Sequence, residues 1–264
     1  MRTVCDGQRV FLFNYHLQRI VDSHRIVLAD SAQQAPANDA QHWDALLRPL
    51  LRRGLALAGH GESKITVLVG ATGVRLQFAP LQAPCALPAC WVRFVSGRRE
   101  HPEAKNLEWV HEREALEQLI VPPISDVVMV EDACCADAPV RFYEGTSSNF
   151  FAVRRITTHD RQPEYRNYEL LAAPRDSVLL GTVMRLVLRI CERDGIGVVH
   201  GAGARMDEWA GAFVSSTSRL VLPVERVLYG SSGEHWWPLD GANPLVIHLR
   251  DSVLCMATEQ SVAI

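Results

Sequence analysis

The sequence predicts an α+β protein with two domains. Segments with strand-like alternation are interleaved with segments of helical spacing along the whole chain. Prolines at positions 80, 84 and 88 make residues 81–88 the best linker, so we expect a small α/β domain over residues 1–84 and a larger mixed α/β domain over residues 85–264. A chain of 264 residues that is 48% hydrophobic can bury cores of that size.

The small domain is predicted to contain two helices and three strands. Apolar residues at helical spacing predict helices over residues 16–29 and 43–58, the second ending at Gly59 and kinked or split by Pro49. Alternating patterns predict a strand over residues 9–13 and a hairpin over residues 65–69 and 74–78. A polar connection over residues 31–40 separates the helices.

The larger domain is predicted to be strand-rich. Strand patterns occupy residues 91–95, 126–130, 140–142, 150–153, 168–172 and 211–214. A short helix follows Lys105, and a strongly amphipathic helix runs from about residue 181 to Gly195. Residues 154–167 form a polar insertion, and residues 244–257 predict a final strand and helix.

Charge and cysteine content exclude several classes of protein. A net charge of −3 and a pI of about 6.4 predict no general attraction to nucleic acid or to an anionic membrane. No apolar run is long enough for a membrane span, and the first residues lack a signal-peptide core. The seven cysteines follow no zinc or disulfide spacing, so we expect no metal site and a reducing, cytoplasmic location.

A carboxylate at the end of an apolar strand is the first candidate site residue. Glu144 follows Val140 and Phe142 and precedes a turn of small polar residues. The same pattern is typical of an ordinary hairpin. Apolar neighbours, however, would keep this carboxylate from water, and a buried carboxylate normally has a cationic partner. The sequence therefore raises the question of which cation pairs with Glu144.

Lysine is rare in this chain. Of the 27 basic residues only Lys64 and Lys105 are lysines, and arginine cannot serve as an amine nucleophile because its guanidinium stays protonated. Each lysine is either a solvated surface residue or present for its amine. Residues 59–64 resemble a phosphate loop weakly, but a helix precedes them and a strand follows, which is the reverse of that motif. We therefore favour Lys105.

Two polar turns could bind an anion. Gly181 and Thr182 begin the amphipathic helix, where free N–H groups and the helix dipole favour negative charge, although an ordinary helix start has the same composition. Residues 215–218 are another cluster of hydroxyls after a strand, which alone reads as a turn. An amine, a carboxylate and two such turns are together the groups that hold pyridoxal 5'-phosphate.

The order of these segments resembles the class IV aminotransferases. The segments that carry the resemblance are 104–110 (AKNLEWV), 142–151 (FYEGTSSNFF), 180–183 (LGTV), 213–218 (FVSSTS) and 222–224 (LPV). They resemble the fold-type IV pyridoxal-phosphate enzymes, which include branched-chain and D-amino-acid aminotransferases and aminodeoxychorismate lyase. The likeness covers about residues 2–228 and is strongest to the plant and protist aminotransferase-like branch. It implies a small α/β domain and a larger pseudo-barrel domain.

The resemblance also implies roles for individual residues. Lys105 would be the catalytic Schiff-base lysine and proton carrier, and Glu144 would pair with the ring nitrogen of the cofactor. The backbone of Thr182 and Val183, with Thr217 and Ser218, would hold the phosphate. Arg2 falls where the family has a phosphate-contacting arginine. The resemblance further implies a homodimer.

Three departures from the family pattern bear on the substrate. The chain begins almost on Arg2, which predicts either a truncated small domain or a misassigned start codon. A tyrosine that commonly follows the lysine is replaced by Trp109 and Val110. The 154–167 insertion is longer than usual. Three hypotheses stay open: a transaminase acting on a small amino acid and a 2-oxo acid, which we prefer, a lyase of the aminodeoxychorismate lyase type, and a non-catalytic relative.

Overall fold

A computed structural model describes residues 1–28, 38–70, 72–81, 89–132, 138–156 and 163–264. The chain forms two compact units, one of residues 1–86 with 254–264 and one of residues 87–253. The boundary predicted between residues 84 and 85 lies outside the described residues. The last 11 residues belong to the first unit, whereas the sequence prediction placed them in the larger domain.

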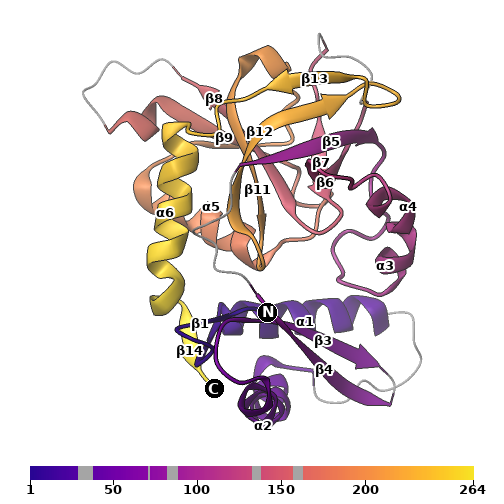
Figure 1. Ribbon diagram of the computed structural model, residues 1–264, viewed down its shortest axis with the longest axis vertical. Helices are drawn as coiled ribbons and strands as arrows, with labels where there is room; N and C mark the ends of the chain where they lie inside the picture. The colour runs from indigo at the N-terminus through magenta and orange to yellow at the C-terminus, as the bar shows by residue number, and fades with distance from the viewer. Residues whose placement is uncertain (29–37, 71, 82–88, 133–137, 157–162) are drawn as a thin grey trace. The chain divides into compact units, whose positions relative to one another are not determined.

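The first unit combines two helices with two small antiparallel sheets (Figure 1). The helices are α1 (Phe13–Leu28) and α2 (Ala40–Ala58), and the hairpin is β3 (Ser63–Gly70) with β4 (Gly73–Pro80). The other sheet has the order β1 (Thr3–Val4), β2 (Arg9–Phe11), β14 (Ser261–Ala263). Helix α2 is one continuous helix through Pro49, and Asp39 caps it by accepting from the backbone N–H of His42 at 2.7 Å.

The C-terminal segment differs from its prediction. We expected a strand followed by a helix over residues 244–257, and this order is wrong. Helix α6 (Pro244–Glu259) comes first, because Pro244 suits the first helical turn and Asn243 Oδ1 accepts from the N–H of Leu245 at 3.0 Å. Strand β14 follows and pairs with β2, which is why the chain end joins the first unit.

The second unit is built on a ring of six strands, β8-β11-β12-β5-β6-β7, in which β7 pairs again with β8 (Figure 1). Strands β9 and β10 extend the sheet beyond β8, and β13 pairs with β12. The strands are β5 (Cys90–Ser96), β6 (Ile124–Val130), β7 (Phe142–Gly145), β8 (Asn149–Arg155), β9 (Tyr168–Ala172), β10 (Val198–His200), β11 (Trp209–Ser216), β12 (Leu220–Tyr229) and β13 (His235–Pro238); the short helices α3 (Glu108–Glu112) and α4 (Glu114–Glu117) precede β6, and α5 (Thr182–Asp194) follows β9. This mixed ring confirms the predicted pseudo-barrel.

One edge of β8 is shared by two strands, and this fork positions the site. Strand β7 pairs with that edge at Asn149, and β9 pairs with it from Phe151 onward, while β11 occupies the whole opposite edge. Since an edge can satisfy one partner at a time, the sheet divides at the start of β8. The chain returns to this point from β9 through residues 173–181 and begins α5 there.

Aromatic side chains fill the ring. Phe94, Phe142, Phe150 and Trp209 come from four different strands, and their ring centroids lie 4.9 to 6.1 Å apart. On the neighbouring strands β8 and β11, Phe151 and Phe213 stack with their ring centroids 4.7 Å apart. The sheet is therefore held by large apolar contacts around the fork.

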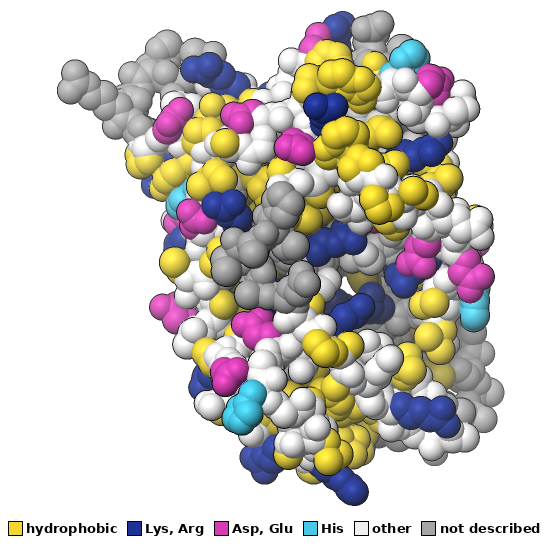
Figure 2. All heavy atoms as spheres, in the orientation of Figure 1, with side chains coloured by type: hydrophobic (Ala, Val, Ile, Leu, Met, Phe, Trp, Pro, Cys, Tyr) yellow, Lys and Arg dark blue, Asp and Glu magenta, His cyan; other side chains and the backbone are white. Residues whose placement is uncertain are grey.

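The outer surface is mixed in character. Acidic, basic and apolar side chains are interspersed on the face shown in Figure 2, and the net charge of the chain is −3. Among the described residues, no helix is long and apolar enough to cross a membrane.

The Phe151–Phe213 stack gives a first prediction. Phe213 is fully buried, so Phe213→Ala should lower the free energy of unfolding by about 3–5 kcal/mol through lost burial and a residual cavity. Urea denaturation measures this change. Val121→Ala, at a position that is 59% exposed in the same unit, is the control and should stay within about 0.5 kcal/mol of wild type. An equal effect of both substitutions would contradict the packing described.

Candidate active site

Glu144 lies where β7 meets β8, at the fork of the sheet. Its side chain is buried, and Oε2 accepts from the backbone N–H of Leu179 at 3.1 Å. The second oxygen, Oε1, is buried without a hydrogen-bond partner among the described residues. Its nearest cation is Arg99, whose Nη1 lies 3.7 Å away, which is an ion pair but too long for a hydrogen bond. Glu144 therefore retains a free acceptor inside the protein.

Asn149 and Ser215 continue a polar row from Glu144 across the sheet. Asn149 is directly opposite Glu144 in one pairing and opposite Ser215 in the other. Asn149 Nδ2 donates to the carbonyl of Leu179 at 2.8 Å. Glu144 and Asn149 are therefore both hydrogen-bonded to the backbone of Leu179. The buried Ser215 hydroxyl has no hydrogen-bond partner among the described residues. In this row, Glu144 Oε1 and the Ser215 hydroxyl are thus both buried without a hydrogen-bond partner among the described residues.

The start of α5 closes over this row. A Cβ on Gly181 would lie 2.3 Å from Asn149 Oδ1, so only glycine fits there. The N-cap residue Gly181 has no side chain that could cap the helix. The first backbone N–H groups of α5, including those of Thr182 and Val183, are therefore available to another acceptor.

The structure brings the two predicted anion-binding turns together. Thr182 Oγ1 lies 3.2 Å from Thr217 Oγ1, although the two residues are 35 positions apart in the chain. Ser218 Oγ lies 3.3 Å from Ser216 Oγ in the same turn as Thr217. The hydroxyl of Thr217 therefore lies next to the start of α5, where an anion is favoured.

Lys105 is exposed and lies just before α3 in the second unit, between the buried Ala104 and the half-buried Asn106. Arg99 organises this stretch, because its Nη2 donates to the carbonyl of Ala104 and to Asn106 Oδ1, the latter at 3.2 Å. The Arg99 guanidinium also lies over the Trp109 ring at 5.1 Å. Arg99 thus links the Lys105 segment directly to Glu144.

Burial controls the ionisation of Glu144. Loss of hydration raises the pKa of its carboxyl from 4.5 to about 7, while the positive charges of Arg99 and Lys105 and the N–H of Leu179 oppose that rise. Burial also lowers the pKa of Arg99.

Arg2 lies in the first unit. Its side chain is fully buried and forms an ion pair with Glu62, and its backbone bridges to Lys64. The phosphate role expected for Arg2 stays a prediction.

Sequence reasoning missed four residues that shape the site. Arg99, Asn149, Asp126 and Arg219 were given no role of their own, although Asn149 lies in the 142–151 segment and Asp126 in a predicted strand. The available signals were a lone charge inside an apolar strand, as with Asp126, and an arginine directly after a hydroxyl-rich turn, as with Arg219. Both signals indicate a buried ion pair but do not name its partner.

Comparison with known proteins decides the family. The family model for amino-transferase class IV matches residues 1–227. The chain belongs to the class IV aminotransferase family. It is accordingly a pyridoxal-phosphate-dependent enzyme, which confirms the predicted family, fold class and cofactor and counts against a non-catalytic relative.

Solved structures share this fold at low sequence identity. A branched-chain aminotransferase from Thermoproteus uzoniensis is 17% identical with a TM-score of 0.69, over 96% of this chain and 81% of that one. A hypothetical aminotransferase from Mycobacterium tuberculosis in its PLP-bound form is 17% identical with a TM-score of 0.67, over 94% and 85%. The 4-amino-4-deoxychorismate lyase from Pseudomonas aeruginosa is 16% identical with a TM-score of 0.64, over 96% and 88%. No curated protein matches the sequence.

The residues of this class IV aminotransferase fit the family cofactor. The free Oε1 of Glu144 can accept from a protonated ring nitrogen, and the α5 N-terminus with Thr182 and Thr217 can hold a phosphate. Lys105 supplies an amine on the same unit. The described residues contain no cluster of three or more histidine, cysteine or acidic side chains that could hold a metal ion.

The raised pKa of Glu144 gives a second prediction. Between about pH 4.5 and pH 7 the folded protein holds a proton that the unfolded chain has released, so stability falls as pH rises through this window, by up to about 3 kcal/mol. Glu144→Gln should remove this loss in the protein without cofactor. Urea denaturation at about pH 5 and about pH 8 measures it.

The matched control is Glu225→Gln. Glu225 is exposed, and its Oε1 accepts a hydrogen bond from Trp91 Nε1 at 2.9 Å. This variant should keep the pH dependence of the wild type. An unchanged pH dependence in Glu144→Gln would show that Glu144 is not the group responsible.

Proposed function

We propose that this enzyme transfers an amino group between a small amino acid and a 2-oxo acid. The observation that carries the proposal is the meeting of three groups in one unit: the under-bonded Glu144, the facing Thr182 and Thr217 hydroxyls, and the Lys105 segment tied to Glu144 through Arg99. Each group matches one part of pyridoxal phosphate, namely its ring nitrogen, its phosphate and its aldehyde.

In this proposal each residue has a separate task. Lys105 binds the cofactor through its amine and then moves the proton taken from the substrate α-carbon. Glu144 holds the proton on the ring nitrogen, and the cofactor, when bound, supplies an electron sink. Thr182, Val183, Thr217 and Ser218 hold the phosphate, with Arg2 as a further contact. The charge of Arg99 favours the ionised form of Glu144 and partly offsets the effect of burial on its pKa.

The substrate class is supported by what the structural neighbours contain. The Thermoproteus uzoniensis enzyme is described with norvaline, and the Mycobacterium tuberculosis aminotransferase with α-ketoglutarate and pyridoxamine phosphate. Two aminotransferases that share this fold thus have structures with an amino acid or a 2-oxo acid. The proposal also includes a homodimer in a reducing cytoplasm, in line with the free thiols of Cys5, Cys90, Cys191 and Cys255.

A lyase of the aminodeoxychorismate lyase type is the second candidate. The likeness to the Pseudomonas aeruginosa lyase supports it, because that enzyme has the same fold over 96% of this chain. The same cofactor site would serve both reactions, and the two differ in which substrate bond breaks.

The two lysines of the chain provide a matched test of the cofactor role. Lys105→Arg should abolish the visible absorbance of bound pyridoxal phosphate and its covalent trapping by borohydride, because a guanidinium cannot form the linkage. Lys64→Arg, at an exposed lysine of the first unit, should leave both unchanged. Peptide mass spectrometry after borohydride locates the label. Label on Lys64, or on neither lysine, would contradict the assignment.

Product analysis distinguishes the two reactions. With a panel of small amino acids and a 2-oxo acid, the loaded enzyme should produce a new amino acid and a new 2-oxo acid in equal amounts. With aminodeoxychorismate it should produce no pyruvate. Chromatography of both reactions measures this, and pyruvate with an aromatic amine from the second reaction would establish the lyase instead.

A further inference from the structure

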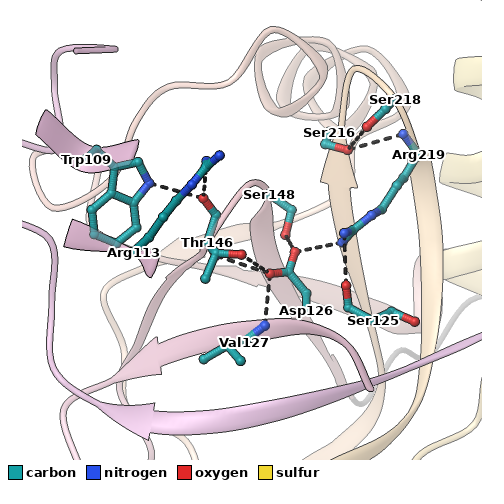
Figure 3. Close-up of polar contacts among 10 residues, drawn as sticks. All are labelled: Trp109, Arg113, Ser125, Asp126, Val127, Thr146, Ser148, Ser216, Ser218 and Arg219. Atoms are coloured by element: carbon teal, nitrogen blue, oxygen red, sulfur yellow. Dashed lines mark hydrogen bonds and ion pairs between the residues drawn. The ribbon is translucent and has the colours of Figure 1, made fainter. Parts of the chain in front are cut away.

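Asp126 is a second buried carboxylate, and it has many more partners than Glu144. It is fully buried at the start of β6. It accepts five hydrogen bonds, from Val127 N at 2.9 Å, Thr146 N at 3.2 Å, Thr146 Oγ1 at 2.8 Å, Ser148 Oγ at 2.7 Å and Arg219 Nη1 at 2.7 Å (Figure 3). A buried carboxylate with this many donors is a fixed anchor for each of them.

The donors come from turns that carry the candidate site. Thr146 and Ser148 belong to residues 145–148, which directly follow Glu144. Arg219 ends residues 216–219, the turn that contains Thr217, and its backbone N–H also donates to Ser216 Oγ at 3.2 Å. Arg219 Nη2 donates to the carbonyl of Ser125 at 2.9 Å. The guanidinium of Arg219 is therefore bonded to two adjacent residues of β6, Ser125 and Asp126.

The segment after Lys105 reaches the same network. Trp109 Nε1 and Arg113 Nη1 both donate to the carbonyl of Thr146, at 3.1 and 3.0 Å (Figure 3). Thr146 therefore connects the helix that follows Lys105 with Asp126. Residues 109–113, 145–148 and 216–219 are thus far apart in the sequence but belong to one hydrogen-bond network around Asp126.

We infer that Asp126 is a positioning residue that fixes the Glu144 turn (145–148) and the Thr217 turn (216–219) at the spacing of the cofactor, with Arg219 as the link to the second turn. Asp126 acts on the cofactor only through these turns. In the proposed function, on which this inference rests, Glu144 directly before the first turn pairs with the ring nitrogen of pyridoxal phosphate, and the second turn holds its phosphate. Movement of either turn would separate the ring partner from the phosphate partners.

Two ligands and two variants test the inference. Arg219→Met keeps the length of the side chain and releases only the Thr217 turn, so affinity for pyridoxal 5'-phosphate should fall roughly 10- to 100-fold while affinity for pyridoxal, which has no phosphate, stays within about 2-fold. Asp126→Asn releases both turns, so affinity for both ligands should fall. Equilibrium binding by absorbance measures each constant without turnover.

Hydrogen exchange of the protein without cofactor is the second measurement. In Asp126→Asn the peptides covering residues 145–148 and 216–219 should exchange faster together, and in Arg219→Met those of residues 216–219 should respond most. Arg154→Met is the matched control, since Arg154 pairs with Glu169 at 2.6 Å in the same unit but outside the network. This control should change neither exchange nor the ratio of the two affinities.

The possible results are separable. Equal loss of both ligands in Arg219→Met, no loss at all, or faster exchange in only one turn of Asp126→Asn would overturn the positioning role of Asp126. If Asp126→Asn fails to fold, Arg219→Met alone decides, because a general loss of structure cannot produce a phosphate-selective effect. If the wild type binds neither ligand, the proposed function fails and this inference fails with it.

Discussion

The cost of burying a carboxylate governs how this protein is built, and the molecule meets it in two opposite ways. Asp126 and Glu144 lie on the neighbouring strands β6 and β7, and both are shielded from water. Within the described part of the chain, the Asp126 carboxylate accepts five hydrogen bonds, whereas the Glu144 carboxylate accepts one and has a cation at 3.7 Å. A saturated carboxylate stabilises its surroundings, and an under-bonded one is available to a ligand. This difference fits the positioning role inferred for Asp126 and the cofactor-binding role proposed for Glu144.

Gly145 allows the two carboxylates to lie so close. A Cβ at this position would come within 2.6 Å of Ser148 Oγ and 3.0 Å of Asp126 Oδ2. Any larger residue would push apart the turn that separates the two acids. The glycine after Glu144 therefore belongs to the Asp126 network as much as to the site itself.

The fork in the sheet explains why the site lies where it does. Because β7 and β9 share one edge of β8, the sheet opens beside Asn149, and the start of α5 fills the opening. Helix N–H groups and strand side chains thereby face each other without a loop between them. A site on a helix start and strand ends is held more rigidly than one on free loops.

The sequence predicted the parts of this site better than their connections. Glu144, Thr182 and Thr217 were identified because each stands in a short local pattern, a carboxylate after an apolar strand or a hydroxyl at a turn. The structure places Thr182 and Thr217 side by side, as the cofactor hypothesis requires. Strands β12 and β13 were not predicted, because β12 carries Pro223 and charged residues that interrupt its alternation.

Contacts over long sequence separation could not be read from single residues. Arg219 reaches Asp126 across 93 positions, and nothing local to either residue specifies that partner. The C-terminal strand was misplaced for the same reason, since its pairing with β2 spans almost the whole chain. Arg99 stands in the sequence between Arg98 and Glu100, and only the fold reveals that it is buried against Glu144. Partner choice depends on topology, which local patterns do not encode.

Glu144 finally connects stability with function. With a pKa of about 7, its carboxyl is ionised at a cost in the protein alone, and Arg99 at 3.7 Å only partly offsets this cost. A protonated ring nitrogen on Oε1 would supply the missing hydrogen bond and charge, so cofactor binding relieves the cost instead of adding one. Binding energy of this kind stabilises the loaded fold by mass action. The free oxygen is thus a destabilising feature of the protein without cofactor and a reason for the protein with cofactor to be the more stable form.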